Sequence, residues 1–470
     1  MRKRTLLLTT ALTTTLLTLP TTPASATPSG LSGDFNGDGY RDLAIGDRGA
    51  TVAGAKKAGA VVVLLGDANG LDPARRVIVS QNSPGIPGTA EAGDAFGTDI
   101  VTKDMNKDGY ADLVVTAPSE NDGDYTGTVT VLWGSASGLT RGSAYKNPKY
   151  KDKGFAKDIA VGDFNADGRQ DLVAVDDDNI WYLRGPFTTS GSRGSATNFD
   201  PTDGENISPD RVVAGKITKD GTVDFAVLGD DWDTDSNRVW FYKGGSGGPT
   251  KTKKVSLPAS ASLTEASVTI ADYDKNGYGD LTLGSPRTSP GGAVYVLPGT
   301  STGPSSSART ITQSTSGVPG AREFGDRFGS DVSAADADGD GYPDLAVGVS
   351  GEMIGDGPFY AGGLTLLRGG SSGLTGKNAR WYDYGTPGIE GETTDDGGLG
   401  DSVQLTDVTH DGRPELVASA PNADFPDGTL GRVFVLPGTS SGPTGTGSLS
   451  LTPATLGDTS IKYLWGALSD

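Results

Sequence analysis

The chain has no cysteine and only one histidine, His410. Without cysteine there can be no disulfide bond, no thiol nucleophile and no thiolate metal site. With a single histidine, a Ser-His-Asp triad would have to use His410. A transition-metal site with several imidazole ligands is excluded. Beyond the N-terminus there is also no apolar run long enough to cross a bilayer. We therefore expect no membrane insertion.

Residues 1–26 have the three parts of a secretory signal. A basic start (residues 2–4) precedes a Thr-diluted apolar stretch (residues 6–19), and the small residues 24–26 fit a cleavage site. We therefore expect a secreted, extracellular chain that begins at residue 27. An exported protein without disulfides needs another means of stabilisation, and bound metal is the obvious one.

Positive charge is scarce in this sequence. The chain carries 59 acidic against 39 basic residues, which gives a net charge of −20. Such a chain is repelled by nucleic acids and by anionic lipid surfaces, so neither is expected as a partner. Solvation is the plain explanation of the acidity. The acidic residues also recur in register, however, which indicates a specific use as metal ligands.

An internal repeat dominates the rest of the sequence. An acidic nine-residue loop followed directly by an apolar strand occurs seven times, with its first residue at Asp34, Asp104, Asp163, Lys216, Asp272, Asp336 and Asp407. The spacing of 53 to 71 residues indicates a propeller or a solenoid. Each unit holds four short apolar runs, the number of strands in a propeller blade. The sequence thus predicts an all-β fold: one seven-bladed β-propeller over residues 27–470, with four-stranded antiparallel blades and the acidic loop between strands one and two.

The second unit illustrates the predicted blade. Strand one is expected at 96–101, the acidic loop at 104–112, strand two at 113–116 and strand three at 127–133, followed by a Gly-Ser turn into strand four. The first unit has no complete strand one before its loop. The C-terminal segment 463–468 is similar to that missing strand. We expect this segment to close the ring against blade 1 and to remove an open sheet edge.

The acidic loops have the composition of a calcium site. Positions 1, 3, 5 and 9 carry side-chain oxygens, position 7 can supply a backbone carbonyl, and position 6 is glycine in all seven loops. A loop that wraps one cation needs a sharp turn there, which glycine makes most easily. Oxygen ligands without histidine or cysteine favour Ca²⁺ over a transition metal. An Asx-rich turn explains one such loop, but converging carboxylates in six loops would repel one another without a cation.

Five loops have a complete ligand set, and the seventh has a weaker one. The predicted ligands, with the position-7 residues acting through their carbonyls, are Asp34, Asn36, Asp38, Tyr40, Asp42, Asp104, Asn106, Asp108, Tyr110, Asp112, Asp163, Asn165, Asp167, Arg169, Asp171, Asp272, Asp274, Asn276, Tyr278, Asp280, Asp336, Asp338, Asp340, Tyr342, Asp344, Asp407, Thr409, Asp411, Arg413 and Glu415. The fourth loop has Lys216 and Thr218 at positions 1 and 3, and we expect the Lys216 ammonium to replace the ion. The sequence therefore predicts about five or six structural Ca²⁺ ions.

Short motifs flank these loops. Phe96-Gly97 and Phe328-Gly329 precede the loop in two units, the seventh unit has Leu399-Gly400 instead, and pairs such as Ala117-Pro118 follow strand two. Together with the loops, these motifs resemble the FG-GAP repeats of integrin α-chain propellers and of their bacterial relatives. The resemblance covers nearly the whole chain after residue 26. It implies calcium-stabilised blades and a ligand-binding face opposite the calcium loops.

Loop lengths favour the same face. Segments between strands two and three are long in blades 1, 2, 6 and 7, and strand alternation places them opposite the acidic loops. Long loops on a rigid scaffold often bind ligands, with neutral loop growth as the alternative. We expect a monomeric binding or adhesion module whose partner is an extracellular protein or glycan. The predicted contact residues are Tyr125, Arg322, Glu323, Phe359, Tyr360 and Phe425.

Two other functions stay open at this point. A secreted hydrolase is one, because some FG-GAP proteins are described as phospholipases or esterases. The Gly-x-Ser-x-Gly pattern, which can mark the nucleophile of a hydrolase, occurs four times. All four copies stand at the same place in their repeats (244–248, 299–303, 369–373 and 438–442). A nucleophile elbow should occur once, between a strand and a helix, so hairpin turns are the better interpretation. A purely structural surface protein is the other alternative. We predict no catalytic residue.

Overall fold

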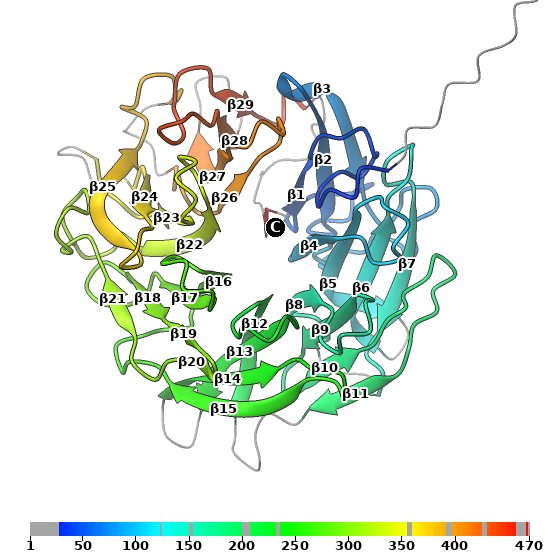
Figure 1. Cartoon of the computed structure of the whole chain (residues 1–470). Helices are drawn as coiled ribbons and strands as arrows, with labels where there is room; N and C mark the ends of the chain where they lie inside the picture. The colour runs from blue at the N-terminus through cyan, green and yellow to red at the C-terminus, as the bar shows by residue number, and fades with distance from the viewer. Residues whose placement is uncertain are drawn as a thin grey trace, which may run out of the picture.

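The computed structural model describes residues 28–122, 125–149, 154–199, 207–231, 236–354, 360–391, 397–424, 430–456 and 467–468. In these ranges the regular structure is β-strand without any helix, and so without a helix that could span a membrane. Seven four-stranded antiparallel sheets stand as blades around a central axis (Figure 1). The predicted seven-bladed β-propeller is confirmed. The predicted secretory signal lies outside the described residues.

In blades 2 to 7 the acidic loop connects the two inner strands, whereas in blade 1 it leads into β1 and the innermost strand comes from the C-terminal segment. The innermost strands are β4 (Ile100–Lys103), β8 (Asp158–Gly162), β12 (Ile207–Gly215), β16 (Ser267–Ala271), β22 (Phe328–Ala335), β26 (Val403–Thr406) and β30 (Ala467–Leu468). The second strands are β1 (Leu43–Asp47), β5 (Asp112–Asp122), β9 (Asp171–Val175), β13 (Asp224–Asp231), β17 (Asp280–Ser285), β23 (Asp344–Val349) and β27 (Glu415–Asp424). Each second strand begins at position 9 of an acidic loop or one residue later. The seven loops therefore lie on one face of the ring.

The two outer strands complete each blade. The third strands are β2 (Ala60–Asp67), β6 (Tyr125–Trp133), β10 (Ile180–Leu183), β14 (Ser236–Lys243), β18 (Ala293–Leu297), β24 (Leu364–Arg368) and β28 (Leu430–Leu436). The outermost strands are β3 (Gly70–Val79), β7 (Arg141–Lys146), β11 (Ala196–Phe199), β15 (Thr250–Ser256), β21 (Arg309–Ile311), β25 (Thr375–Tyr382) and β29 (Leu449–Leu451). In blade 5 the turn between strands three and four contains a two-residue hairpin, β19 (Gly299–Thr300) with β20 (Gly303–Pro304).

The hydrophobic core is divided among the blade junctions. Second and third strands such as β1 and β24 are buried along their whole length, because each has a neighbouring blade on both faces. Two-sided burial requires near-continuous runs of Val, Leu and Ile rather than alternation with polar residues. In the described part of the chain, buried side chains form seven clusters, each joining two adjacent blades. One of them joins blade 7 to blade 1, through residues such as Val417 and Ile45.

The ring closes by the predicted route. β30 pairs antiparallel with β1, with Ile45 opposite Leu468 and Gly46 opposite Ala467. The sheet of blade 1 has the order β3-β2-β1-β30, so the C-terminal segment supplies its innermost strand (Figure 1). Leu468 also packs against the cluster that joins blades 7 and 1. Residues 463–466 of the predicted segment lie outside the described residues.

The Phe-Gly motif links adjacent blades, and in blade 2 it stands before strand one, whereas in blade 6 it starts β22. β4 begins at Ile100, so the predicted start of strand one at residue 96 is wrong. Phe96 is fully buried and forms an isolated parallel bridge with Gly59, just before strand three of the preceding blade. Gly59 has a φ of 87°, and a Cβ there would collide with the Phe96 backbone. Equivalent bridges join Gly292 to Phe328 and Gly362 to Leu399.

Two segments opposite the acidic loops are longer hairpins than the sequence predicted. In blade 2 the predicted loop 119–126 is mostly strand, with Asn121 opposite Thr126 and Asp122 opposite Tyr125. In blade 4, where a short connection was expected, β13 and β14 extend until Asp231 faces Ser236. Long segments on this face are therefore not confined to blades 6, 7, 1 and 2. Continued pairing is favoured because it satisfies backbone groups that an irregular loop would leave to water.

Candidate metal centres and the central channel

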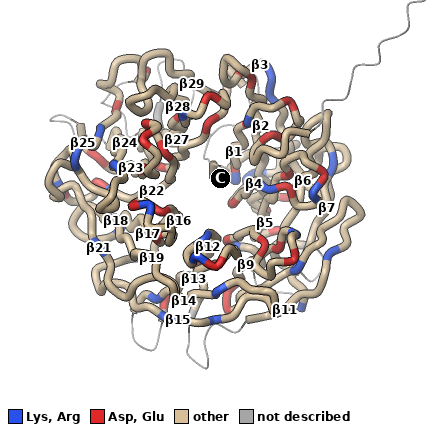
Figure 2. Tube along the Cα trace, in the orientation of Figure 1, with Lys and Arg blue, Asp and Glu red and all other residues tan. Residues whose placement is uncertain are grey.

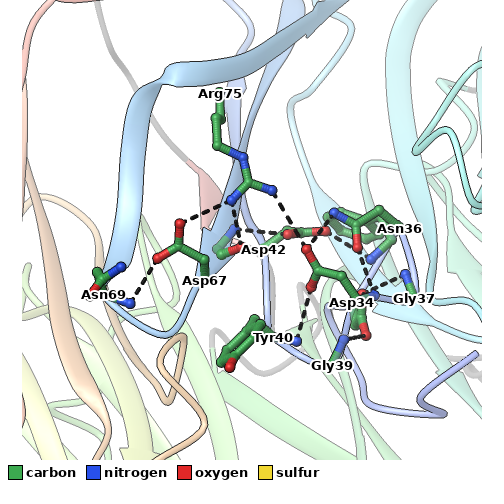
Figure 3. Close-up of polar contacts among 12 residues, drawn as sticks. Asp34, Asn36, Gly37, Gly39, Tyr40, Asp42, Asp67, Asn69 and Arg75 are labelled. Atoms are coloured by element: carbon green, nitrogen blue, oxygen red, sulfur yellow. Dashed lines mark hydrogen bonds and ion pairs between the residues drawn. The ribbon is translucent and has the colours of Figure 1, made fainter. Parts of the chain in front are cut away.

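The first residue of an acidic loop folds the loop around its own carboxylate. In blade 1, Asp34 accepts hydrogen bonds from the backbone N–H groups of Gly37 (2.6 Å), Asp38 (3.1 Å) and Gly39 (2.8 Å), as Figure 3 shows. The carboxylates at position 1 of five further loops accept from the position-6 N–H in the same way: Asp104, Asp163, Asp272, Asp336 and Asp407. The glycine at position 6 has a positive φ in all seven loops, 95° at Gly39. The turn expected from glycine is therefore the one observed.

The last ligand position is buried beneath the loop. In blade 1, Asp42 accepts a hydrogen bond from the N–H of Phe35 (2.9 Å), at position 2, and another from Gly66 (3.0 Å), near the end of strand three. Asp112 and Asp280 make the equivalent pairs of bonds in blades 2 and 5. These carboxylates tie each acidic loop to the turn between strands three and four of the same blade.

Burial makes the position-9 carboxylates costly to ionise. It raises the pKa of Asp42 and of Asp112 to about 7, although the bound N–H groups act in the opposite direction, and neighbouring loop carboxylates add to the rise. Burial also raises the pKa of Asp280 and of Asp344 to about 6, and that of Glu415 to about 7. A cation placed beside such carboxylates favours their ionised form.

The loop side chains fit a small divalent cation. Carboxylate oxygens of Asp336, Asp338 and Asp340 all lie within 4.8 Å of one another. In the seventh loop the Thr409 Oγ1 atom is buried and has no hydrogen-bond partner among the described residues. Hard oxygen donors converging from positions 1, 3 and 5 suit Ca²⁺. The calcium sites themselves, and the role of the position-7 carbonyls, stay predictions.

The fourth loop differs from what the sequence predicted. Lys216, expected to place its ammonium where the ion would be, is exposed. The ammonium beside the loop comes from Lys243 at the end of β14, whose Nζ lies 3.2 Å from a carboxylate oxygen of Asp220. Thr218 donates both its N–H and its hydroxyl to Asp224 (2.8 and 2.9 Å). The Lys243 ammonium, from β14 of the same blade, thus balances the carboxylate charge of the fourth loop. The sequence of the loop itself gives no sign of this partner.

The third loop has a partner that sequence reasoning missed. The Tyr182 hydroxyl, on β10, donates to Asp171 Oδ2 (2.9 Å), and Asn165 Nδ2 donates to both Asp171 and Tyr182. Asn165 is almost completely buried. No motif identifies Tyr182, because only the packing of strand three beneath the loop brings its hydroxyl there.

A channel of about 690 Å³ lies at the centre of the ring, lined mainly by the innermost strands. Figure 2 shows acidic and basic segments close to the centre, beside β4, β12 and β22. Side chains at one recurring strand position bond to the next blade: Asp99 accepts from the N–H of Ile159 (2.9 Å), Asp158 from Val212 (2.6 Å) and Asp331 from Val403 (2.7 Å). These bonds join innermost strands that do not pair with one another.

Asp99 and Asp158 are close enough to influence each other. Burial raises the pKa of Asp99, and burial together with the Asp99 charge raises the pKa of Asp158 well above its ordinary value. Arg211 opposes both shifts from the neighbouring blade; its Nε also donates to the carbonyl of Ala266 (2.8 Å). Asp99 and Asp158 share a side-chain hydrogen bond, and burial favours the protonated form of Asp158 over its charged form.

The face opposite the acidic loops carries an exposed aromatic pair. Phe324, between β21 and β22, is 83% exposed, and Tyr360, between β23 and β24, is 47% exposed. A Cβ built on Gly325 would lie 3.5 Å from Tyr360 Cε1, so the two segments lie close to each other. Tyr360 is exposed as a predicted contact residue should be. Phe324 was missed, although it follows the predicted pair Arg322-Glu323 directly in the sequence.

The other predicted contact residues divide into three groups. Arg322 is a cross-link within the fold, since its Nη2 donates to the carbonyls of Ser289 and Gly292 (3.3 Å each). Glu323 is exposed. Phe359 and Phe425 lie outside the described residues, and the side chain of Tyr125, on β6, is not described.

The Gly-x-Ser-x-Gly segments are turns, as expected. Each of the four follows the third strand of its blade: β14, β18, β24 and β28. His410 stands at position 4 of the seventh acidic loop, where it is exposed and has a φ of 55°. The motifs thus serve as hairpin connections rather than as a strand-to-helix nucleophile elbow.

Comparison with known proteins supports the repeat. Residues 26–64, 96–132, 328–367 and 399–436 match the model of the FG-GAP repeat. These matches fall in blades 1, 2, 6 and 7, which are neighbours in the closed ring. The chain is 31% identical to phosphatidylinositol-glycan-specific phospholipase D of Mus musculus over 166 residues, 34% of this chain and 18% of that protein.

Integrin α-chains are similar over comparable lengths. The identity is 27% to integrin alpha-PS2 of Drosophila melanogaster (40% of this chain, 15% of that protein) and 26% to integrin alpha-5 of Xenopus laevis (43% and 20%). The chain thus matches no more than about a fifth of the length of these relatives. Among solved structures, the Dos1 propeller aligns with a TM-score of 0.44 at 12% identity, over 82% of this chain and 79% of that one. The chain therefore contains four FG-GAP repeats, is similar to integrin α-chains and has the fold of a seven-bladed β-propeller.

Proposed function

We propose that the chain is a secreted, calcium-stabilised propeller that binds an extracellular protein or glycan on the face opposite its acidic loops. One observation carries this proposal: oxygen-rich loops of the same conformation recur on one face, which leaves the elaborated opposite face for a partner. The signal-like residues 1–26 and the similarity to integrin α-chains support an extracellular setting.

Calcium has a structural role in this proposal. The side chains at positions 1, 3, 5 and 9 of loops 1, 2, 3, 5, 6 and 7 would hold the ions, whose charge would neutralise the converging carboxylates. In blades 2, 3, 5, 6 and 7, position 9 starts strand two and position 1 follows strand one, so these loops would cross-link two strands. A ligand that binds only the folded state stabilises it by mass action, by about 4 kcal/mol per site at a thousandfold excess over Kd.

Chelation tests this part of the proposal. We expect EGTA to lower the melting temperature sharply and added Ca²⁺ to restore it. Mg²⁺ should restore the melting temperature less, because it requires a stricter coordination geometry than Ca²⁺. Differential scanning fluorimetry of the purified chain measures both effects. An unchanged melting temperature in EGTA would rule out structural calcium.

The partner face is assigned from its exposed aromatic side chains. Phe324 and Tyr360 lie on neighbouring segments, and both side chains are exposed. Aromatic rings provide much contact area at low entropic cost, and they stack on sugar rings or fill apolar pockets of protein partners. The segments that carry them belong to blades 5 and 6, at the edge of the sector that matches the FG-GAP model.

Binding experiments with single variants test the assignment. A screen against extracellular-matrix proteins and glycans, with Ca²⁺ present, identifies the ligand. We expect Phe324→Ala and Tyr360→Ala to weaken binding by on the order of tenfold or more each. Val77→Ala is the matched control, because Val77 is also exposed (42%) but lies on the outermost strand β3. Equal binding by all three variants would refute this choice of face.

A hydrolase is the second candidate, favoured by the similarity to phosphatidylinositol-glycan-specific phospholipase D. It is tested by incubating the purified chain with a phosphatidylinositol-glycan substrate and Ca²⁺. Release of the glycan would support an enzyme. No release over hours at micromolar protein would remove this candidate.

A further inference from the structure

Arg368 is placed unlike any other basic residue near an acidic loop. It is the last residue of β24, and its side chain is only 10% exposed. Its Nη1 lies 2.7 Å from Asp344 Oδ2 and 3.2 Å from Asp338 Oδ2, at positions 9 and 3 of the sixth loop. Its Nη2 donates to the carbonyl of Ser441 (2.8 Å), in the turn of blade 7 that follows strand three. One guanidinium thus joins the loop of blade 6 to the neighbouring blade.

The same strand position is occupied differently in other blades. The residue just before the glycine that follows strand three is Leu65, Trp133, Arg184, Lys243, Pro298, Arg368 or Pro437. Arg184 is half-exposed and lies 3.7 Å from Asp167, and Lys243 is half-exposed and pairs with Asp220. Both reach only position 5. Arg368 alone of these residues contacts the buried position-9 carboxylate in the described part of the chain.

The contact with Asp344 takes the place of a loop contact. In blades 1, 2 and 5, one oxygen of the position-9 carboxylate accepts from the glycine after strand three and the other from the N–H of position 2. In blade 6, Gly369 donates to Oδ1 (3.0 Å) and Arg368 donates to Oδ2. The guanidinium therefore stands on the side of the carboxylate that faces the loop.

A guanidinium and a divalent cation compete for the same oxygens. Arg368 already forms ion pairs with two of the four carboxylates in the sixth loop, and its charge repels an incoming ion at close range in a poorly solvated site. Calcium can coordinate both Asp338 and Asp344 only if the Arg368 guanidinium breaks at least one of its two ion pairs with them. The sixth loop has the most carboxylates of any loop, yet it alone has this buried internal competitor.

We propose that Arg368 makes the sixth loop an exchangeable calcium site, held closed by the guanidinium at low calcium and opened when the ion displaces it. The other predicted loops keep their ions as permanent structural parts. Displacement of Arg368 also disturbs its bond to Ser441, so occupancy of the sixth loop alters the junction of blades 6 and 7. This inference rests on the proposed calcium binding.

Calcium titration of an Arg368→Gln variant tests the inference. We expect the weakest site of the wild type to gain on the order of ten- to a hundredfold in affinity, because glutamine removes the charge but can still donate to Asp344. Isothermal titration calorimetry of calcium-depleted protein measures the affinities. Arg184→Gln is the matched control, and it should change no affinity by more than about twofold. An unchanged weakest site in Arg368→Gln overturns the inference.

A second measurement does not touch Arg368. Asp336→Ala disables the sixth loop, so native mass spectrometry should show one ion fewer than wild type at saturating calcium and the same number at low micromolar calcium. Loss of an ion at both concentrations would show that the sixth loop is as tight as the others, and the inference would be wrong. Absence of bound calcium in every variant would instead refute the proposed calcium binding itself.

Discussion

At the scale of single residues, buried carboxylates of this propeller are of two kinds. Those at position 9, such as Asp42, face a loop rich in further oxygens and are stabilised by backbone N–H groups and by any cation the loop holds. Asp99 and Asp158 face each other and Arg211 inside the channel, far from the acidic loops. The first kind is suited to metal, whereas the second is suited to sharing a proton.

Asp158→Asn should change how stability depends on pH. Burial and the Asp99 charge raise the pKa of Asp158 in the folded protein above its ordinary value of 3.8, so the folded state keeps a proton that the unfolded chain releases. The stability contributed by this group is complete at acidic pH and is lost as the pH rises through the folded-state pKa. Asparagine cannot ionise, and its carbonyl can still accept from the Val212 N–H.

Thermal unfolding with saturating calcium measures this effect. The stability of Asp158→Asn relative to wild type should rise with pH, by about 1.4 kcal/mol per pH unit at most, up to the folded-state pKa. Asp72→Asn makes the same chemical change at an exposed carboxylate and serves as the matched control. A constant difference between Asp158→Asn and wild type at all pH values would show that the pair does not share a proton.

At the scale of elements, the acidic loop keeps only part of its conformation when its ligands are lost. The fourth loop lacks position-1 and position-3 carboxylates, yet Gly221 keeps the positive φ (90°) found at position 6 elsewhere. Asp224 still accepts from Gly244, as its equivalents accept from the glycine at that place, but its other bond comes from Thr218 at position 3. The positive φ at position 4 of the other six loops is not found at Lys219. The turn at position 6 therefore forms without the missing carboxylates, and the remaining side chains decide which cation balances the loop.

The number of bound ions should depend on which loop is altered. Asp108 and Asp220 both occupy position 5, in the second and fourth loops. We expect Asp108→Ala to remove one of about five or six ions, because the second loop has a full set of oxygen donors. Asp220→Ala should leave the count unchanged, because Lys243 supplies the cation there. Native mass spectrometry counts the ions, and loss of one from Asp220→Ala would mean that the fourth loop binds metal.

At the scale of the whole molecule, the ring is held by contacts between blades that do not share a sheet. Seven apolar clusters, the Phe-Gly bridges and the aspartates of the channel each join one blade to the next. Blade 1 is closed by strand pairing as well, because β30 comes from the end of the chain and pairs with β1 near its start. Both ends of the described chain thus meet in blade 1 (Figure 1).

Removal of residues 459–470 should destabilise the entire ring. The truncation deletes β30, exposes the inner edge of β1 and uncovers part of the cluster around Ile45. We expect the melting temperature to fall by roughly 5 °C or more, since 1 kcal/mol shifts the midpoint of a domain by about 2–4 °C. Removal of residues 469–470 alone, beyond β30, is the control and should have little effect. An unchanged midpoint for the longer truncation would show that the strand does not close the ring energetically.

Local sequence determined the number of blades, the position of each acidic loop and the segment that closes the ring. These features are encoded within short stretches: an oxygen donor at every second position, a glycine where φ must be positive, and an apolar strand directly after position 9. Each depends on dihedral angles and ligand spacing over about nine residues, so it can be recognised without knowing what packs nearby.

Only the tertiary structure decided which partners complete the loops and the channel. Lys216 is adjacent to the fourth loop in sequence but points to solvent, whereas Lys243 and Arg368 reach their carboxylates from the third strand of the same blade. Asp99 and Asp158 stand 59 residues apart and meet because consecutive blades turn their innermost strands toward one axis. Such contacts arise from how blades pack, and nothing in a nine-residue pattern specifies which side chain a neighbouring strand will bring.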